Sequence, residues 1–246
     1  MALRKKPAHN EPHAAYGWGL PVWWVPLIIT ALAAHVDKDL DGVEIFCGAR
    51  ELTNACRRAG LAMACMDKAT VDARHDVTQP EGIKIAINYL CRCRPHSLIW
   101  LGIVCSSWVF VGRSNAGRYG WWPEGDGTKA YTQLHNHIAQ AGVHLASLAY
   151  HLGLIYVVEN PITSVLFDWD PMRLMLRKTG AVRVVVNLNG FQAPTLKTLC
   201  LWGTAPWLES LQERAHFLAP FAPPPTQELV KTTVSRLGIS NWTTSC

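Results

Sequence analysis

Two side chains in this sequence could carry out covalent chemistry together, a thiol and a carboxyl group that each follow an apolar run. Cys105 comes shortly after the run Leu98–Leu101, and Glu159 comes directly after Ile155–Val158. Such runs predict buried parallel strands, and open α/β sheets bind their ligands at the ends of these strands. There a thiolate can attack an electrophilic carbon and a carboxyl group can hold or deliver a proton. We therefore expect Cys105 and Glu159 to lie at one edge of a sheet.

Each of these residues also has a structural interpretation. Taken alone, Cys105 would be a buried apolar cysteine, because free cysteines are among the most buried residue types. Glu159 is harder to explain in structural terms, because it is an acid at the mouth of a parallel sheet, one strand along from the cysteine. The pair therefore favours a chemical role more strongly than either residue alone.

A βαβ unit near the start of the chain could hold a nucleoside cofactor beside this pair. The predicted elements are a strand over Val43–Phe46, a tight turn over Cys47–Ala49, a helix over Glu51–Ala59 and a second strand over Leu61–Met66. In such units the first turn and the helix N-terminus approach one end of the cofactor. An acid after the second strand, here Asp67, takes the ribose hydroxyls. The alternative role for this acid is helix capping or turn formation.

The rest of the chain continues the alternation of helices and strands, which predicts an α/β fold. Further helices are expected over Pro26–Val36, Glu81–Cys91 and Tyr131–Leu152, and further strands over Val182–Val186 and Leu199–Trp202. The segment 106–128 is predicted to be a loop, and loops of this length usually carry function or are disordered. We divide the chain into an N-terminal tail with an apolar helix (residues 1–36), a catalytic domain (37–205) and a short C-terminal extension (206–246).

The composition is typical of a globular protein. Of the 246 residues, 49% are hydrophobic and 17% are charged, and the net charge of +5 suits an anionic partner such as nucleic acid. The eight cysteines form no Cys-x-x-Cys pair, so we expect reduced thiols, an intracellular setting and no metal site. The apolar segment Trp18–Ala34 is short for a membrane span and contains Pro21 and Pro26. We therefore expect no stable membrane association, with peripheral contact as the alternative.

Four segments of the chain together resemble the DNA (cytosine-5) methyltransferase family. They are EIFCGARELTNACRRAG followed by Asp67, LGIVCSSWVFVGR, VVENP and FQAPTLKT, which stand in the order and roughly the spacing of that family's motifs. The resemblance covers about Val43 to Thr204. It implies a Rossmann-like S-adenosylmethionine-dependent methyltransferase fold, with a mostly parallel sheet and helices on both faces. It also implies S-adenosyl-L-methionine as cofactor and a flipped cytosine of DNA as substrate, with RNA as the alternative.

The resemblance assigns the cofactor to residues at the ends of the first three strands. The family's Phe-x-Gly turn, its acid after the second strand and its acid near the adenine all have counterparts here, as does the glycine of its Gly-Phe-Pro-Cys loop. The cofactor-binding residues that it implies are Phe46, Gly48, Asp67, Asp76 and Gly102.

The resemblance also assigns the catalytic groups. Cys105 matches the family's nucleophilic cysteine, and Glu159 and Asn160 match its Glu-Asn-Val motif. Carbon 5 of cytosine is a poor nucleophile, so a Cys105 thiolate would add to carbon 6 and turn the ring into an enamine. Glu159 would bind ring nitrogen 3 and the exocyclic amine, and Asn160 would orient the loops.

Several positions depart from the family's pattern. Val104 stands where the family has a proline, Arg50 and Glu51 replace glycines of the first turn, and Glu44 stands in place of an aspartate. Only a short segment follows Thr198, where the family places a target-recognition domain. We therefore expect that the chain reads DNA poorly, that a protein partner supplies target recognition, or that the sequence is a fragment. The alternative function is a catalytically inactive methyltransferase-like module that binds cofactor or nucleic acid.

Basic and aromatic side chains of the later loops could contact nucleic acid. The candidates for phosphate contact are Arg113, Arg118 and Lys197, with solvated loop charges as the alternative. The aromatic residues of the long loop could cover or replace a flipped base, or pack on the sheet; they are Trp108, Trp121 and Trp122.

Overall fold

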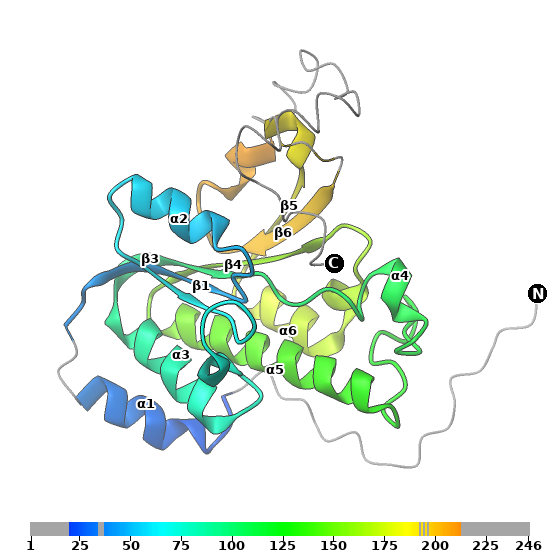
Figure 1. Cartoon of the computed structure of the whole chain (residues 1–246), viewed down its shortest axis with the longest axis horizontal. Coiled ribbons are helices and arrows are strands. Elements are labelled where there is room, and N and C mark those ends of the chain that lie inside the picture. Colours follow the sequence, from blue (N-terminus) through cyan, green and yellow to red (C-terminus); the bar gives the residue numbers. More distant parts are fainter. Residues whose placement is uncertain (1–19, 34–36, 192, 194, 196, 213–246) are drawn as a thin grey trace, which may run out of the picture.

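The structure is a computed structural model that describes residues 20–33, 37–191, 193, 195 and 197–212. These residues fold around one six-stranded sheet (Figure 1). The strands are β1 (Leu40–Ile45), β2 (Met63–Met66), β3 (Cys93–Leu101), β4 (Ile155–Pro161), β5 (Val182–Asn187) and β6 (Thr198–Gly203). The helices are α1 (Trp24–Ala33), α2 (Glu51–Arg58), α3 (Pro80–Arg92), α4 (Phe110–Arg113), α5 (Ala130–His151) and α6 (Asp170–Lys178).

The sheet is mixed but mostly parallel. Its strand order is β2-β1-β3-β4-β6-β5. Strands β1 to β4 pair in parallel, whereas β6 pairs antiparallel with both β4 and β5. Only β6 of the six strands therefore runs in the opposite direction. The predicted α/β class and the mostly parallel sheet are confirmed, and this arrangement is compatible with a Rossmann-like fold without being specific to it.

The chain reverses its direction across the sheet at β1, and this reversal creates a switch point. From β1 the chain moves to β2 on one side and then to β3 on the other. Open α/β sheets bind ligands in the crevice at the carboxyl ends of two such strands. Ile45 of β1 lies opposite Leu101 of β3, and Leu101 lies opposite Val158 of β4. The segments that follow β1, β3 and β4 therefore meet at one edge.

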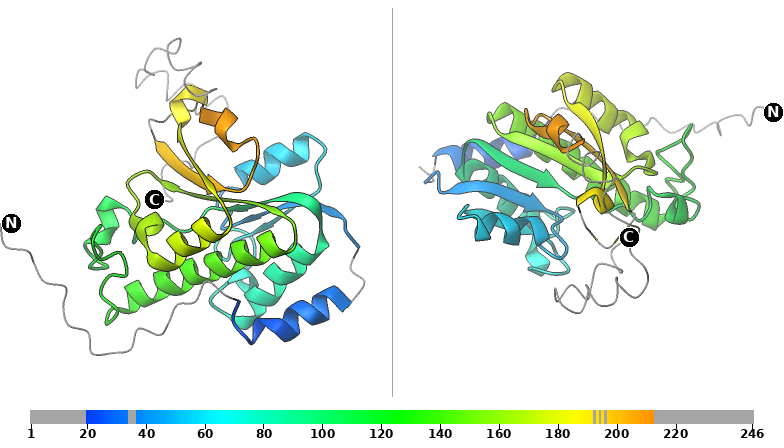
Figure 2. Two further views of the ribbon diagram at one scale, coloured as in Figure 1. Left: turned by 180° about the vertical axis from the view of Figure 1, so that it is seen from behind. Right: turned by 90° about the horizontal axis from the view of Figure 1, so that it is seen from above.

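Helices cover both faces of the sheet, as predicted (Figures 1 and 2). Helix α2 packs on one face against β1 and β2, and α3 and α5 pack on the other face with α6 beside α5. The alternation of side chains along β1 explains this layering, because Val43 and Ile45 belong to the core beneath α3. Helix α1 packs against α3. Trp24 anchors it there with only 1% of its surface exposed.

Glu44 of β1 points to the opposite face and fixes the start of α2. Its Oε2 atom accepts hydrogen bonds from the backbone N–H of Thr53 (2.7 Å) and from the Thr53 hydroxyl (2.5 Å). These bonds cap the N-terminus of α2. The N-cap residue itself, Arg50, forms no capping hydrogen bond with its side chain. Burial is the main cause that raises the pKa of Glu44 above its ordinary value. The glutamate that departs from the family's pattern thus holds α2 over the end of β1.

The structure differs from the sequence prediction in two segments. The predicted loop 106–128 contains the short helix α4. Helix α6 is absent from the prediction, although its buried Met172, Met175 and Leu176 have helical spacing. The predicted helix over Pro26–Val36 corresponds to α1, and its last three residues lie outside the described residues. In the described part of the chain no helix is both long and apolar enough to cross a membrane.

Candidate functional site

The turn after β1 has an unusual backbone. Phe46 (φ 61°) and Arg50 (φ 62°) adopt left-handed conformations on either side of Gly48 (φ 45°). For a bulky aromatic residue this conformation is an outlier that persists only where the surrounding structure fixes it, and such strain clusters at ligand sites. A Cβ atom placed on Gly48 would meet no atom within 4 Å. A ligand can therefore approach this part of the backbone closely.

The end of β3 lies directly against this turn. The backbone N–H of Gly102 donates a hydrogen bond to the carbonyl of Ile45 (3.0 Å). A Cβ atom on Gly102 would lie 3.2 Å from the carbonyl oxygen of Phe46, so a larger residue would press on the turn. The fold thus brings three predicted cofactor-binding residues together at the switch point: Phe46, Gly48 and Gly102.

Asp67 connects the end of β2 to the same turn. Its carboxylate accepts hydrogen bonds from the backbone N–H groups of Gly48 (3.2 Å), Ala69 (2.8 Å) and Thr70 (3.0 Å). An ionised carboxylate offers about four lone-pair positions, so about one remains for a ligand. Asp67 therefore has the turn-forming role that the sequence left as its alternative, and it keeps room for one further hydrogen bond.

Asp76 lies on the connection between β2 and α3. One carboxylate oxygen accepts bonds from the N–H (2.9 Å) and hydroxyl (2.6 Å) of Thr78, and the other accepts a bond from Lys68 (3.0 Å). Burial acts to raise the pKa of Asp76, but the bonds from Thr78 and Lys68 outweigh it and lower that pKa. Asp76 thus organises the turn before α3, and Lys68 links it to the segment that begins at Asp67.

Asn160 ties the end of β4 to the segment that carries Cys105. Its side-chain amide donates hydrogen bonds to the carbonyls of Ile103 (2.6 Å) and Glu159 (3.0 Å), and only 1% of its surface is exposed. From the other side, a Cβ atom on Gly142 of α5 would lie 2.6 Å from the Ile103 side chain. The segment before Cys105 is therefore held on two sides, and the loop-orienting role predicted for Asn160 agrees with this geometry.

Cys105 lies at the start of the turn that leads into α4. Its carbonyl accepts hydrogen bonds from the backbone N–H groups of Trp108 (2.8 Å) and Val109 (3.1 Å). The residue is 4% exposed, and its sulfur forms a disulfide. The other six cysteines of the described chain are free thiols, so the predicted reduced state holds for them but is wrong for Cys105. Cys105 must be reduced before it can attack a substrate, because the thiolate is the nucleophile.

Glu159 presents a carboxyl group with a raised pKa at the end of β4. Burial is the main cause of the increase, and a hydrogen bond from Trp100 and the charge of Lys197 act against it. The indole N–H of Trp100 donates to Oε2 of Glu159 at 3.0 Å. Lys197, predicted to contact nucleic acid, therefore lies close enough to influence this carboxyl group. A raised pKa favours the protonated form, which can donate a hydrogen bond as well as accept one.

The prediction that Arg118 contacts phosphate is wrong, because Arg118 is fully buried. Its guanidinium group lies 3.5 Å from the ring centroid of Trp108, and burial lowers its pKa to about 10. The group donates hydrogen bonds to Ser107, to the carbonyls of Pro123 and Glu124, and to the Asn136 side chain. Arg118 thus anchors the segment between α4 and α5 from within. Trp108 is buried with it and does not face a substrate.

Arg113 remains available for a phosphate. It is partly buried, its guanidinium group lies 5.1 Å from the ring centroid of Phe110, and it forms no ion pair with the described residues. The predicted basic contacts therefore reduce to Arg113 and Lys197.

We expect Arg118→Ala to lower the free energy of unfolding by about 3 kcal/mol, because buried carbonyl and amide oxygens would lose their donor. Urea denaturation of the full chain measures this change. The control Arg113→Ala removes an arginine that forms no ion pair with the described residues and should cost less than about 0.5 kcal/mol. Equal costs for the two variants would contradict the anchoring role of Arg118.

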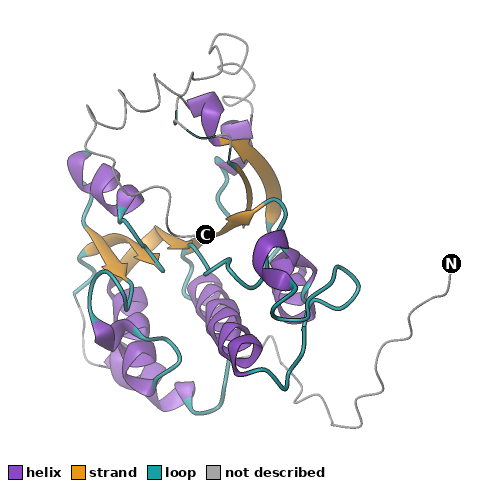
Figure 3. Ribbon diagram, turned by 45° about the vertical axis from the view of Figure 1, so that its right-hand side comes forward, coloured by secondary structure: helices purple, strands orange, loops and turns teal. Residues whose placement is uncertain are grey.

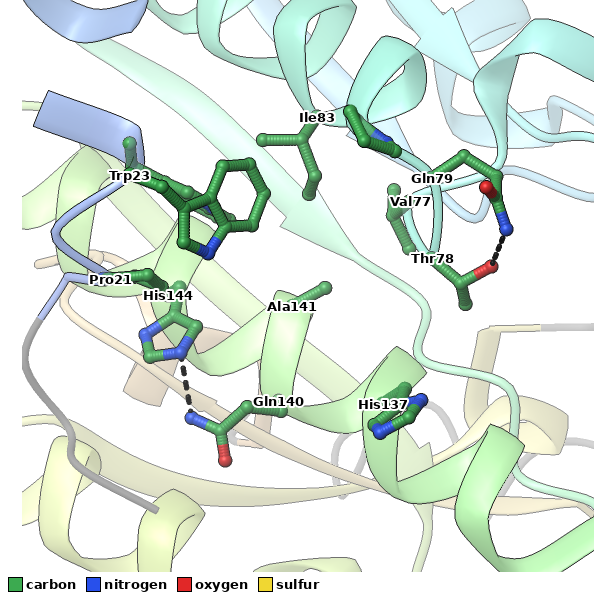
Figure 4. Close-up of a pocket in the computed structure, with 12 residues that line it drawn as sticks. Pro21, Trp23, Val77, Thr78, Gln79, Ile83, His137, Gln140, Ala141 and His144 are labelled. Atoms are coloured by element: carbon green, nitrogen blue, oxygen red, sulfur yellow. Dashed lines mark hydrogen bonds between the residues drawn. The ribbon is translucent and has the colours of Figure 1, made fainter. Parts of the chain in front are cut away.

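A pocket of about 370 Å³ lies between the start of α1, the beginning of α3 and the middle of α5 (Figure 4). Its wall is mostly apolar and includes Trp23, Ile83 and Ala141. Burial lowers the pKa of His144 in this wall to about 4, so its ring is neutral and accepts a hydrogen bond from Gln140 (2.9 Å). None of the residues predicted to be catalytic, to bind the cofactor or to contact nucleic acid lines this pocket. It therefore forms no part of the candidate site.

Trp100 belongs to the site, although it was not predicted from the sequence. The signal was present, because the period-2 alternation of a strand places Trp100 on the face opposite Ile99 and Leu101. Ile99 and Leu101 belong to the core beneath α3 and α5, whereas Trp100 faces the side on which Glu159 lies.

The sequence matches no protein-family model and no curated protein.

Proposed function

We propose that this chain binds S-adenosyl-L-methionine and transfers its methyl group to carbon 5 of a cytosine in DNA, through a covalent adduct with Cys105. The observation that carries the proposal is the hydrogen bond from Asn160 to the carbonyl of Ile103. It couples the strand end that bears Glu159 to the segment that bears Cys105. The two segments that carry the required groups are thus linked by one buried side chain.

The residues at the switch point fit the cofactor. The open space at Gly48 and the left-handed turn from Phe46 to Arg50 allow close approach of a ligand to the backbone. Asp67 has about one acceptor position left for a ribose hydroxyl. The side chains of Arg50 and Glu51 are exposed and do not fill the turn. When bound, S-adenosyl-L-methionine supplies an electrophilic methyl group.

The chain's own residues would prepare the cytosine for that group. The Cys105 thiolate adds to carbon 6, and the electron pair of the double bond makes carbon 5 nucleophilic. Protonated Glu159 donates a hydrogen bond to ring nitrogen 3 and accepts one from the exocyclic amine, which stabilises the adduct. After carbon 5 has taken the methyl group, it loses its proton to a base and the carbon–sulfur bond breaks. The Cys105 thiolate and the aromatic ring are then restored.

The second candidate function is a catalytically inactive module that binds the cofactor or nucleic acid. One observation favours it, since Cys105 is 4% exposed and disulfide-bonded. In this state the thiolate is absent and the methyl transfer described above cannot begin. The same switch point would still bind a nucleoside.

We expect the purified, reduced protein to bind S-adenosyl-L-methionine in a calorimetric titration and to transfer its labelled methyl group to mixed DNA. Both results would support the enzyme. Binding without transfer would favour the inactive module. A folded protein that binds no S-adenosyl-L-methionine would contradict the enzyme and a module that binds the cofactor, and would leave only a module that binds nucleic acid. The control for binding at the switch point is Gly48→Val, which crowds the open turn.

A further inference from the structure

Three aromatic rings at the surface of the segment between α4 and α5 form a stack. We use the name aromatic stack for Tyr119, Trp121 and Trp122. The ring centroids of Tyr119 and Trp121 are 5.3 Å apart with an angle of 9° between the planes. Those of Trp121 and Trp122 are 6.2 Å apart with an angle of 21°. Trp121 is 54% exposed and Tyr119 is also exposed, so the stack offers aromatic surface to solvent.

The aromatic stack is held in a fixed orientation, although its segment forms no regular helix or strand (Figure 3). Tyr119 and Trp122 exchange backbone hydrogen bonds of 3.1 and 2.9 Å, which close a tight turn around Gly120 and Trp121. The residue before the turn is Arg118, whose buried guanidinium group binds the carbonyls of Pro123 and Glu124 just after it. A buried charge is costly, and here it fixes a turn whose rings are exposed. The turn that carries the rings is therefore fixed by hydrogen bonds on both sides.

The aromatic stack follows the segment that carries Cys105 and is hydrogen-bonded to it through α4. Val104 is exposed immediately before the cysteine, and Phe110 and Val111 are exposed on α4, which begins a few residues later. The backbone N–H of Arg118 donates to the carbonyl of Arg113 at the end of α4 (2.8 Å). Figure 1 shows α4 and the segment after it, in green, beyond the edge at which the parallel strands end. Exposed apolar side chains thus stand on both sides of the candidate catalytic cysteine in the sequence.

We infer that the aromatic stack binds unpaired bases of the nucleic-acid substrate, and that the protein therefore prefers single-stranded over double-stranded DNA. Bases stack on exposed aromatic rings irrespective of sequence, with basic side chains beside the rings for the phosphates. The candidate for that second requirement is Arg113, whose backbone carbonyl is hydrogen-bonded to Arg118 just before the stack and which forms no ion pair with the described residues. The net charge of +5 also favours an anionic ligand. An unpaired cytosine also avoids the cost of extrusion from a duplex. The inference rests on the proposed function only for the identity of the substrate.

The test measures binding apart from methyl transfer. A fluorescently labelled single strand of about 12 nucleotides with one cytosine, and its duplex, are titrated with the reduced full-length protein without cofactor. We expect Trp121→Ala to weaken single-strand binding roughly 5- to 150-fold, which corresponds to the about 1–3 kcal/mol of one stacked base. Duplex binding should change less than about twofold, and Trp121→Phe should restore most of the single-strand affinity.

The control is Trp23→Ala, because Trp23 is 52% exposed on the segment leading into α1 and matches Trp121 in residue type and exposure. It should leave both affinities unchanged. Single-strand binding that is unaffected by Trp121→Ala, or equally affected by Trp23→Ala, would overturn the inference. So would a wild-type protein that binds the duplex as tightly as the single strand. Trp121-dependent binding without any methyl transfer would uphold the inference and contradict the proposed function.

Discussion

Replacing Cys105 by serine should reduce methyl transfer at least about 10³-fold, because the covalent step depends on a thiolate and a serine hydroxyl is far less ionised. Binding of S-adenosyl-L-methionine should stay within about twofold, since the switch-point residues keep their contacts. Transfer of a labelled methyl group to single-stranded DNA measures the first effect, and calorimetry measures the second. Both assays contain reductant, because the Cys105 sulfur otherwise forms a disulfide.

The matched control for this substitution is Cys56→Ser, on α2. Cys56 is a partly buried free thiol and plays no part in the proposed chemistry. A second readout uses DNA that contains 5-fluorocytosine. Fluorine there replaces the carbon-5 hydrogen that must leave as a proton, so the adduct persists. Wild-type protein and the Cys56 variant should become covalently attached to this DNA, and the Cys105 variant should not. Undiminished transfer by Cys105→Ser would rule out the covalent mechanism.

Replacing Glu159 by glutamine should reduce methyl transfer about 10²- to 10⁴-fold, which is the usual contribution of a positioned acid or base. The glutamine keeps the shape of the side chain and can still accept the hydrogen bond from Trp100. It cannot supply the carboxyl proton to ring nitrogen 3. In the wild type, transfer should fall as pH rises through the raised pKa of Glu159, because the protonated form is then lost. The variant should lack that fall.

The same substitution should stabilise the protein at high pH. Because the folded state raises the pKa of Glu159 above 4.5, the folded protein binds the proton more tightly than the unfolded chain. The stabilisation that this bound proton gives the folded state is complete below pH 4.5. It is lost as the pH rises through the pKa of Glu159 in the folded protein. Glu159→Gln should therefore have a higher melting temperature at about pH 8, by about 2–4 °C for each kcal/mol, and little advantage below pH 4.5. The control is Glu209→Gln, because Glu209 is exposed. An equal change in the melting temperature of both variants would contradict a buried Glu159 carboxylate.

The fold followed from the sequence where periodicity was strong. Continuous apolar runs marked β3 and β4, and the helix before Gly60 and the long helix before Gly153 ended close to the predicted positions. The antiparallel insertion of β6 between β4 and β5 did not follow, because strand order depends on contacts between distant segments. Helix α6 was not predicted although its apolar residues have helical spacing, because the helix is only nine residues long.

The candidate site was only partly accessible to the same reasoning. Strand ends indicated that Cys105 and Glu159 share an edge, and the parallel register of β3 and β4 agrees with this. The sequence could not show that Arg118 points inward, because an arginine in a polar loop is usually solvated. Nor could it show the strained backbone of Phe46, since residues with positive φ other than glycine have no strong sequence signal.

The position of β6 also has a consequence for biosynthesis. Among the described residues β6 is the last strand in chain order, yet it lies between β4 and β5 in the sheet. While the chain is being synthesised, β4 therefore has one open edge and β5 has no neighbour until residues Thr198–Gly203 have left the ribosome. Open strand edges readily pair with other chains, so this is the interval in which the nascent protein is most exposed to aggregation. The strand that carries Glu159 thus gains its second neighbour only after about 40 further residues have been synthesised.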